Sequence, residues 1–458
     1  MNTQALLKAN HITDTLIRDT NENQKSIYQK LCAKEATIAL VGLGYVGLPI
    51  ALEFAKSFKT IGFDINKSRI DLMKRGIDPS GELSKLDFLD RDIYFTNVAE
   101  TLDNADVIVV AVPTPVSREN EPDLKPLISA CESIGVSLGK GNIVIFESTV
   151  FPGCTEEVCI PILERISGYK CNKDFWVGYS PERINPGDEV NTLTKITKIV
   201  SGSNAFAEEQ IFQIYNHIIE AGVYVASSMK VAEAAKIVEN TQRDVNIALM
   251  NELSTFCNSM GINTHEVLKA AGTKWNFLNF YPGLVGGHCI GVDPYYLIHK
   301  ASEIGLNLGV ISESRKINDS MPSRVVDQVE EALRGLGKSL KNSKVLVLGT
   351  TFKENVSDLR NSKSAEMCQI LSIKAHTLDI IDPNASQEEM LRYYGLHLSE
   401  VIDDGYDAII YAVNHKEFDH ITWNLINSIK SENVVVFDFK KILDYPSKQD
   451  SNITYLTL

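Results

Sequence analysis

Short apolar runs separated by longer amphipathic segments make up most of the chain after about residue 35. In the first half, these runs lie at residues 36–41, 60–64, 106–112, 142–147 and 175–179. Runs of this length are typical of buried parallel strands, and the segments between them have the length of helices. Strands that alternate with helices predict a doubly wound parallel sheet with right-handed crossovers.

A second series of apolar runs, at residues 344–352, 376–382, 406–413 and 433–439, follows the order of the first. TIALVGLGY corresponds to KVLVLGTTF, for example, and ADVIVVAVPTP corresponds to YDAIIYAVNH. Any two α/β domains can share such patterns, but matches in one order favour structural similarity between the halves. We therefore predict an α/β protein with two Rossmann-like doubly wound parallel sheets, joined by a central helical domain with one long helix.

The stretch from about Lys230 to Ala271 has no proline, and its apolar residues recur every three or four positions. This pattern predicts one long helix that crosses between domains or forms a dimer interface. The first 34 residues are polar, and we expect one or two loosely docked helices there. The expected division is an N-terminal extension (1–34), a dinucleotide-binding domain (35–225), a central helical domain (226–325) and a C-terminal Rossmann-like domain (326–458).

Charge and cysteine usage narrow the class of protein. The 45 Lys and Arg against 59 Asp and Glu give a net charge of -14, which argues against general nucleic-acid binding and a polybasic membrane anchor. The N-terminus lacks the pattern of a secretory signal, and the sequence contains no run of about 18 apolar residues, so we expect no membrane-spanning helix. The eight cysteines are scattered without a C-x-x-C pair or zinc spacing, so we expect a reduced, cytoplasmic protein without a metal site.

A glycine-rich turn follows the first predicted strand. Gly42, Gly44 and Gly47 form a G-x-G-x-x-G pattern that opens a predicted helix, and this context favours dinucleotide binding. Asp64 ends the second predicted strand, where an acidic side chain accepts hydrogen bonds from a ribose diol and repels a 2′-phosphate. The prediction is NAD rather than NADP. The alternative is that the glycines serve only helix–strand packing.

One cysteine differs from the others in its surroundings. Cys289 lies in the segment GGHCIGVDP, whose small residues leave room for ligands, and Asp293 follows it by one helical turn. A thiol beside a helix N-terminus is expected to have a lowered pKa and to be a better nucleophile. From the local sequence alone, a buried and inert cysteine is an equal alternative.

Further polar residues fall where a ligand would bind. Lys236 and Asn240 share a helix face, on the same side as Glu233, and a lysine–asparagine pair can bind an alcohol oxygen; an exposed lysine is the alternative. Glu147 and Glu182 lie where strands give way to loops, and a carboxylate there could activate water or simply cap the loop. In the second half, the basic residues that suggest an anionic ligand or else a solvated loop are Lys353, Arg360, Lys440 and Lys441.

The combination of motifs resembles a known family. GLGYVGLP, VPTP, ESTVFPGCT, YSPERINPGD, EAAKIVENTQRD, GGHCIGVDPYYL and GTTFKENVSDLRNS fall in order over about residues 35–445, and together they resemble the UDP-glucose/GDP-mannose dehydrogenase family. The resemblance implies oxidation of a sugar C6 hydroxymethyl to a carboxylate with two NAD⁺, in a homodimer or higher homo-oligomer. Within the family, the motif forms look like the bacterial UDP-N-acetylhexosamine branch. UDP-N-acetylglucosamine is the expected substrate, UDP-N-acetylgalactosamine, UDP-N-acetylmannosamine and UDP-glucose are alternatives, and the product would enter a capsule or O-antigen.

The resemblance also implies residue roles. Lys236, Asn240 and Asp293 would handle the C6 oxygen, and Cys289 would form a thiohemiacetal and then a thioester. Glu182 would be the base that activates water, with Thr149 positioning it, whereas Glu147 receives no role. The residues implied in cofactor binding are Gly42, Gly44, Tyr45, Val46, Gly47, Asp64, Thr114, Ser148 and Thr149. Those implied in substrate binding are Arg183, Lys236, Asn240, Arg243, Tyr281, Gly283, Lys353 and Arg360.

Two other classes of protein deserve comparison. A two-electron 2-hydroxyacid or sugar-acid dehydrogenase also joins a Rossmann domain to helices with a lysine–asparagine pair, but it lacks the G-G-H-C nucleophile and the third domain. An NAD-binding regulator without catalysis would not need the nucleophile, lysine and carboxylates together. In one departure from the family pattern, Lys440 stands where many relatives have arginine, which leaves that contact less certain.

Overall fold

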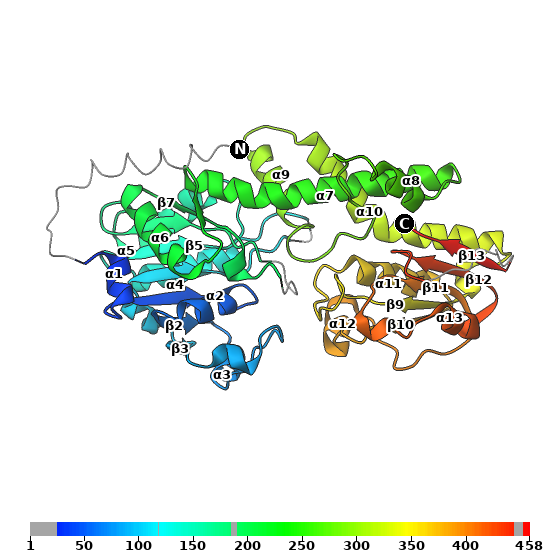
Figure 1. The fold of residues 1–458 in the computed structure, drawn as a ribbon, viewed down its shortest axis with the longest axis horizontal. Helices are drawn as coiled ribbons and strands as arrows, with labels where there is room; N and C mark the ends of the chain where they lie inside the picture. Colours follow the sequence, from blue (N-terminus) through cyan, green and yellow to red (C-terminus); the bar gives the residue numbers. More distant parts are fainter. Residues whose placement is uncertain (1–24, 118, 185–189, 444–451) are drawn as a thin grey trace.

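The computed structural model describes residues 25–117, 119–184, 190–443 and 452–458. Two α/β domains lie at the two ends of an elongated molecule, and long helices join them (Figure 1). Within the described residues, no helix is both long enough and apolar enough to cross a membrane.

The first domain contains a sheet in the order β3-β2-β1-β4-β5-β6-β7-β8. Its strands are β1 (Thr37–Val41), β2 (Lys59–Phe63), β3 (Ile93–Thr96), β4 (Val107–Val110), β5 (Ile143–Phe146), β6 (Trp176–Tyr179), β7 (Lys198–Gly202) and β8 (Val223–Val225). The helices are α1 (Ile27–Cys32), α2 (Gly47–Phe54), α3 (Lys67–Met73), α4 (Lys125–Ser137), α5 (Ile160–Ser167) and α6 (Ala205–Ile218). Short helical turns lie at η2 (Lys85–Phe88), η3 (Ala99–Asn104), η4 (Thr155–Cys159) and η5 (Leu193–Lys195).

The five strands predicted in this half are confirmed, but the sheet is not parallel throughout. β7 runs antiparallel to β6, with Gly178 opposite Gly202 and Tyr179 opposite Ser201. In the described part of the connection from β6 to β7, residues 180–184 and 190–197, the only helical element is the short η5 turn, and β7 enters the sheet in the opposite direction. Two apolar layers, one on each face, bury the central strands of this sheet, while residues of the edge strands β3 and β8 are partly exposed.

The C-terminal domain holds a parallel sheet in the order β10-β9-β11-β12-β13. Its strands are β9 (Lys344–Leu348), β10 (Thr377–Ile381), β11 (Tyr406–Tyr411), β12 (Lys430–Asp438) and β13 (Ile453–Leu456). The helices and helical turns are η6 (Leu340–Asn342), α11 (Lys363–Lys374), α12 (Gln387–Tyr394), η7 (Lys416–Phe418) and α13 (Trp423–Ile429). The four predicted strands are therefore confirmed, and the short β13 follows them.

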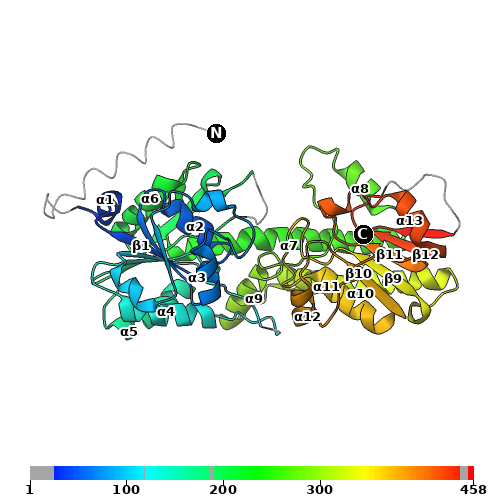
Figure 2. The ribbon, with the colours of Figure 1, turned by 90° about the horizontal axis from the view of Figure 1, so that it is seen from below.

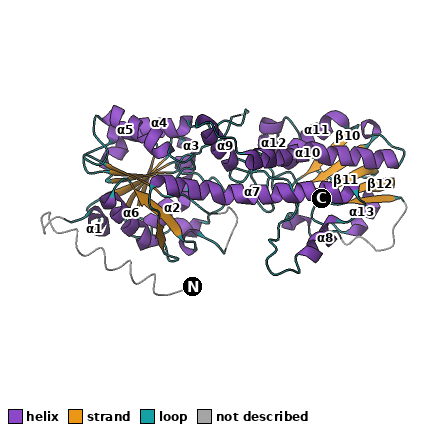
Figure 3. Cartoon of the chain, turned by 90° about the horizontal axis from the view of Figure 1, so that it is seen from above, coloured by secondary structure: helices purple, strands orange, loops and turns teal. Residues whose placement is uncertain are grey.

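The central segment consists of α7 (Met229–Ser259), α8 (Thr264–Ala271), α9 (Asp293–Glu303) and α10 (Gly309–Gly335). The prediction of one helix as far as Ala271 is wrong in its last third. Gly261 has a φ of 68°, in the left-handed region that commonly ends helices, and the Asn263 side chain accepts from the Glu266 N–H to start α8. Figures 2 and 3 show α7 running from one α/β domain to the other.

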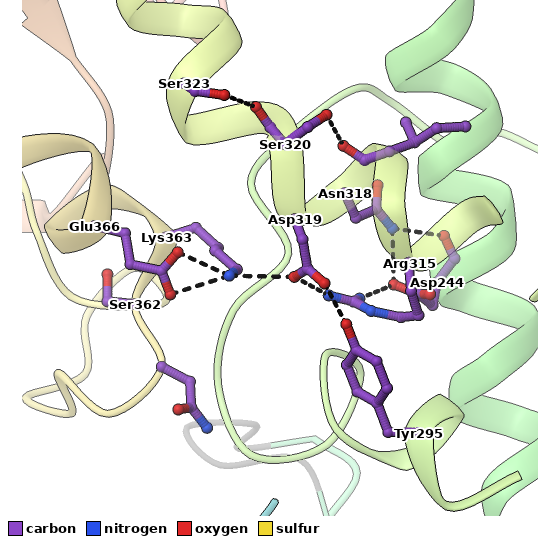
Figure 4. A network of polar contacts seen from close by, with 12 residues as sticks. Asp244, Tyr295, Arg315, Asn318, Asp319, Ser320, Ser323, Ser362, Lys363 and Glu366 are labelled. Carbon is purple, nitrogen blue, oxygen red and sulfur yellow. Dashed lines mark hydrogen bonds and ion pairs between the residues drawn. The ribbon is translucent and has the colours of Figure 1, made fainter. Parts of the chain in front are cut away.

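A buried polar network ties the central helices together (Figure 4). Arg315 of α10 is 2% exposed and pairs with Asp244 of α7 and with Asp319 one turn further along α10. The Tyr295 hydroxyl of α9 donates to Asp319, and Lys363 of α11 lies 3.2 Å from the same carboxylate. The network thus connects the central helices to the C-terminal domain. Pro322 lies inside α10 one turn beyond these contacts.

The predicted N-terminal extension falls partly outside the described residues, because residues 1–24 are not described. Its last part is docked: Leu31 is fully buried, and the Tyr28 N–H donates to the Gln210 side chain of α6 at 3.1 Å. These contacts attach α1 to the first domain.

Candidate active site

A cleft of about 2860 Å³ lies between the two α/β domains. Its walls come from the carboxyl ends of β1, β2, β4 and β5, from the face of α7 that carries Lys236, and from the loop at 352–361. In open α/β sheets this edge is where ligands bind.

The glycine turn after β1 forms one wall and fits a dinucleotide. Gly42 has a φ of 92°, and a Cβ on Gly47 would lie 1.9 Å from the Gly42 carbonyl oxygen, so both positions require glycine. Gly44, in contrast, faces open space, with no atom within 4 Å of an added Cβ. Tyr45 and Val46 also line the cleft, next to the N-terminus of α2. A pyrophosphate can therefore approach the backbone at Gly44 and the helix N–H groups.

Asp64 lies at the end of β2, beside this turn. Its carboxylate accepts from the Leu43 N–H at 2.9 Å and the Asn66 N–H at 2.8 Å, and it lines the cleft. Arg69 of α3 also lines the cleft and donates to the Leu43 carbonyl at 3.0 Å. Sequence analysis missed Arg69, because one arginine in a predicted helix carries no signal.

The cofactor-binding residues predicted beyond the turn also reach the cleft. They are Thr114, Ser148 and Thr149. The Ser148 hydroxyl donates to the Val112 carbonyl at 2.7 Å, and the Tyr296 hydroxyl donates to the Thr114 carbonyl at 2.9 Å. These bonds join the ends of β4 and β5 and attach α9 to the same edge.

The four residues proposed for redox chemistry come together. The Asn240 amide of α7 donates to the Asp293 carboxylate at 2.6 Å, and Lys236 lies one turn earlier on α7. The Asp293 N–H donates to the Cys289 carbonyl at 2.8 Å, which places the cysteine in the turn that opens α9. Lys236 and Cys289 both line the cleft. Burial raises the pKa of Asp293 to about 6, while Lys236 and Asn240 oppose the rise.

The prediction of a lowered pKa for Cys289 is wrong. Burial raises the pKa of this thiol, Asp293 adds to the rise, and Lys236 and a hydrogen bond with Tyr45 oppose it only in part. The helix begins at Asp293 rather than at the cysteine, so the nearest charge at its N-terminus is an acid.

His288, the neighbour of Cys289, joins the cysteine turn to the C-terminal domain. Its Nε2 lies 2.6 Å from Asp358 Oδ2, and its ring stacks on Tyr45 with centroids 5.9 Å apart. Asp358 also accepts from Arg360 at 3.0 and 2.7 Å. Burial would raise the pKa of Asp358, but the hydrogen bonds from His288 and Arg360 hold it well below its usual range. Lys353 lines the cleft beside Arg360, as predicted for an anion site.

Glu182, at 6% exposed, lines the cleft but is already paired. Lys198 Nζ lies 2.8 Å from one Glu182 oxygen and 2.9 Å from Glu147. Sequence analysis missed Lys198, although a lysine inside the apolar run ITKIVSG is a signal for a buried charge.

Glu233, expected on the side of Lys236, instead caps the η4 turn through the Gly153 and Thr155 N–H groups. Burial raises its pKa to about 7 despite these bonds.

Five residues predicted to bind substrate do not line the cleft: Asn240, which bonds to Asp293 as described above, and Arg183, Arg243, Tyr281 and Gly283. Arg183 pairs with Glu239 at 2.6 Å and donates to the Thr197 carbonyl at 2.9 Å. Arg243 is exposed, Tyr281 is 55% exposed, and Gly283 donates its N–H to Asn251 at 2.8 Å. Lys440 pairs with Glu354 at 2.6 Å. In this structure the sugar-binding role of these positions therefore stays a prediction.

Comparison with known proteins assigns the three parts of the chain. Residues 36–219, 230–320 and 346–445 match the NAD binding domain, the central domain and the UDP binding domain of the UDP-glucose/GDP-mannose dehydrogenase family. The fold and cleft thus define an NAD-dependent nucleotide-sugar dehydrogenase. The chain belongs to the UDP-glucose/GDP-mannose dehydrogenase family.

Individual relatives match over nearly the whole chain. The chain is 49% identical to UDP-N-acetyl-D-glucosamine 6-dehydrogenase of Salmonella typhi, over 91% of this chain and 98% of that protein. It is 48% identical to the Pseudomonas aeruginosa protein of the same name, over 90% and 98%. The solved structure of a UDP-D-ManNAc dehydrogenase from Pyrococcus horikoshii superposes with a TM-score of 0.80 at 29% identity, over 92% and 98%.

Proposed function

We propose that the chain oxidises the C6 hydroxymethyl of UDP-N-acetylglucosamine to a carboxylate through a covalent cysteine intermediate. The observation that carries the proposal is that Lys236 and Cys289 line one cleft with the glycine turn, while Asn240 and Asp293, bonded to each other at 2.6 Å, lie next to them on α7 and α9. Identity of 48–49% to two proteins named for this substrate, against 34% to one named for the mannosamine epimer, supports the choice of sugar.

The first oxidation removes the proton of the C6 hydroxyl and a hydride from its carbon; NAD held at the glycine turn would supply the hydride acceptor. The proton passes to water in the cleft, and Lys236 donates to the C6 oxygen and stabilises the negative charge that develops on it. Asn240 orients Asp293 by its 2.6 Å bond, and Asp293, ionised above about pH 6, keeps the Lys236 ammonium directed at the oxygen.

The second oxidation needs a tetrahedral carbon, because an aldehyde does not readily release hydride. The Cys289 sulfur bonds to the aldehyde carbon, the carbon–oxygen π bond breaks, and the thiol proton passes to the oxygen, to which Lys236 donates a hydrogen bond. Loss of a hydride from carbon, for which a second NAD⁺ would be the acceptor, and of the hydroxyl proton to water leaves a thioester. Water then adds to the thioester carbon, the carbon–sulfur bond breaks, and Cys289 is regenerated. We assign the proton of this water to Glu182, with Thr149 beside it on the cleft wall.

The test is the number of NADH formed per UDP-N-acetylglucosamine consumed, with excess NAD⁺. A ratio near two supports the scheme, and Cys289→Ser should then stop the reaction before carboxylate appears. A ratio near one contradicts the thioester and favours a simple alcohol dehydrogenase. Absence of NADH contradicts the choice of sugar, and UDP-N-acetylgalactosamine, UDP-N-acetylmannosamine and UDP-glucose would be compared.

We also propose that two copies of the chain associate through the central helices. Phe256 and Met260 at the end of α7 are 59% and 63% exposed, and Trp275 after α8 is 91% exposed. Such apolar exposure is typical of an interface. Light scattering after gel filtration should give a mass of at least two chains, and Phe256→Glu should lower it.

A further inference from the structure

Three charged side chains lie together behind the cleft wall: Glu147 after β5, Glu182 after β6, and Lys198 at the start of β7. Their side chains are 0%, 6% and 2% exposed. Lys198 Nζ lies between the two carboxylates, 2.9 Å from Glu147 and 2.8 Å from Glu182. Removing three charges from water costs several kcal/mol per ion unless each is well paired, so their partners decide what the cluster can do.

Every carboxylate oxygen in the cluster has a partner. The second Glu147 oxygen accepts from the Tyr215 hydroxyl of α6, and the second Glu182 oxygen accepts from the Arg183 and Ile184 N–H groups at 2.6 Å. Lys198 also lies over the Tyr215 ring, 5.3 Å from its centroid. Glu147 and Glu182 border the cleft, and Lys198 lies behind them. The cluster is therefore a fixed arrangement with one face toward the substrate.

The charges leave one net negative charge. Lys198 alone would neutralise Glu182 and make it a poor proton acceptor, because an adjacent cation favours the ionised carboxylate. Without Lys198, the two buried carboxylates would instead share one proton, so the ionised base would be divided between Glu147 and Glu182 rather than held on Glu182. With all three present, Glu147 balances Lys198, and Glu182 can take up a proton to give a neutral cluster.

We propose that Lys198 is a positioning residue that, balanced by Glu147, holds Glu182 at the cleft in the form that accepts a proton from the hydrolytic water. The inference rests on the proposed function and extends it to two residues behind the cleft wall. In the step concerned, the water oxygen bonds to the thioester carbon and one water proton passes to Glu182. The carbon–sulfur bond breaks, the electron pair leaves on the Cys289 sulfur, and Glu182 later releases its proton through the cleft. This hydrolysis step involves neither oxidation nor reduction.

The surroundings are consistent with this charge balance. Burial raises the pKa values of Tyr179 and Tyr215, so both hydroxyls are neutral near pH 7. Burial also raises the pKa of Glu147, against the opposing effect of Lys198, while the two carboxylates raise the pKa of Lys198 against its burial. The titratable and charged side chains on the elements packed around the cluster include Tyr179, Arg183, Tyr215, Glu233, Lys236, Glu239 and Asp293.

The test compares Lys198→Met, Lys198→Arg and Glu147→Gln with the surface control Lys195→Met, which replaces an exposed lysine on the same loop. Two quantities are measured with UDP-N-acetylglucosamine: the acyl-enzyme that accumulates, by mass spectrometry of acid-quenched protein, and the pH profile of the hydrolysis rate. K198M should accumulate acyl-enzyme, slow hydrolysis about 100-fold and move the acid limb to higher pH. K198R should restore part of the rate, and E147Q should move the acid limb to lower pH.

The outcomes separate this inference from the proposed function. Wild-type enzyme that forms fewer than two NADH contradicts the proposed function, whatever the variants do. Wild-type enzyme that forms two, with K198M and E147Q that keep its pH profile and accumulate no acyl-enzyme, overturns the role of the cluster alone. The melting temperature and NAD affinity of each variant report folding, and E147Q decides the question if K198M does not fold.

Discussion

Asn240 donates to Asp293 at 2.6 Å and thereby joins the middle of α7 to the first residue of α9. Lys236 lies one turn before Asn240 on α7, and the Asp293 N–H bonds to the Cys289 carbonyl. One amide therefore fixes the orientation of the acid that stands between the lysine and the cysteine. Because Asp293 is 1% exposed, its protonation state depends on these neighbours more than on solvent.

Asp293→Asn should remove a pH-dependent step from the first oxidation. With its pKa near 6, Asp293 becomes protonated as the pH falls through that value and ceases to hold the Lys236 ammonium. Single-turnover formation of the first NADH should lose activity below about pH 6 in the wild type, and this limb should be absent in D293N. Persistence of the limb in D293N would assign it to another group. D327N, at an exposed position of α10, is the control.

The same substitution should change the pH dependence of stability. The pKa of Asp293 is raised from 3.8 to about 6, so the folded chain binds more protons than the unfolded chain between these values. The free energy of unfolding therefore falls as the pH rises through this range, by at most about 3 kcal/mol from this group. In urea unfolding, the free energy of unfolding of D293N relative to that of the wild type should be higher at pH 7 than at pH 4. Equal differences at both values would contradict the shift.

Tyr45→Phe should make Cys289 less reactive. The Tyr45 hydroxyl forms a hydrogen bond with the thiol and lowers its pKa, against the dominant effect of burial. Loss of this bond should slow alkylation of Cys289 by iodoacetamide at pH 8 about threefold to tenfold. The site is identified by peptide mass spectrometry. Tyr94→Phe, at a 60% exposed position of β3, should leave the rate unchanged; an unchanged rate in Y45F would exclude the role of the hydroxyl.

Asp358→Asn should weaken binding of the UDP-sugar. Asp358 bonds to His288 at 2.6 Å and to Arg360, so it couples the cysteine turn to the cleft loop of the C-terminal domain. We expect KM for the UDP-sugar to rise about tenfold, while NADH formed per substrate stays unchanged. D403N removes an exposed partner of Lys344 in the same domain and serves as the control. A change in stoichiometry without a change in KM would place Asp358 in the chemistry instead.

Two glycine substitutions should affect different properties: Gly44→Ala should weaken NAD binding, and Gly47→Ala should destabilise the fold. Gly44→Ala adds a Cβ in open space, so the melting temperature should be kept while NAD binds about tenfold more weakly, as measured by calorimetry. Gly47→Ala places a Cβ 1.9 Å from the Gly42 oxygen and should destabilise the fold by about 3 kcal/mol. Unchanged NAD affinity in G44A would contradict the placement of the pyrophosphate.

The sequence predicted the parts of the fold that have long apolar patterns. All nine expected strands exist, because fully buried parallel strands consist of continuous apolar runs. Four strands were missed. β3, β8 and β13 are three or four residues long and lie at sheet edges, where the apolar pattern is weak, and β7 begins with the charged Lys198, which interrupts its apolar run. The break between α7 and α8 depends on one glycine with a positive φ, which an apolar period does not reveal.

The sequence predicted the residues of the redox chemistry more completely than the residues that bind the substrate. Lys236, Asn240, Cys289 and Asp293 carry recognisable spacing and do come together: Lys236 and Cys289 line the cleft, and Asn240 bonds to Asp293 beside them. The thiol pKa was predicted in the wrong direction, since burial is a property of the folded chain. Lys198 could not be assigned because its partners lie 51 and 16 residues away, on other strands.

The position of Pro322 inside α10 bears on how this enzyme can take up and release large ligands. α7 runs between the domains as one continuous helix and α10 packs along it, so a stiff helix rather than a flexible tether joins the two sides of the cleft. A proline has no N–H for the carbonyl four residues before it, so α10 can bend at this point without breaking a backbone hydrogen bond. The Asp319–Lys363 contact, one turn before Pro322, attaches this part of α10 to the C-terminal domain. A bend at Pro322 would move that domain relative to α7, so opening of the cleft would be concentrated in this one turn of helix.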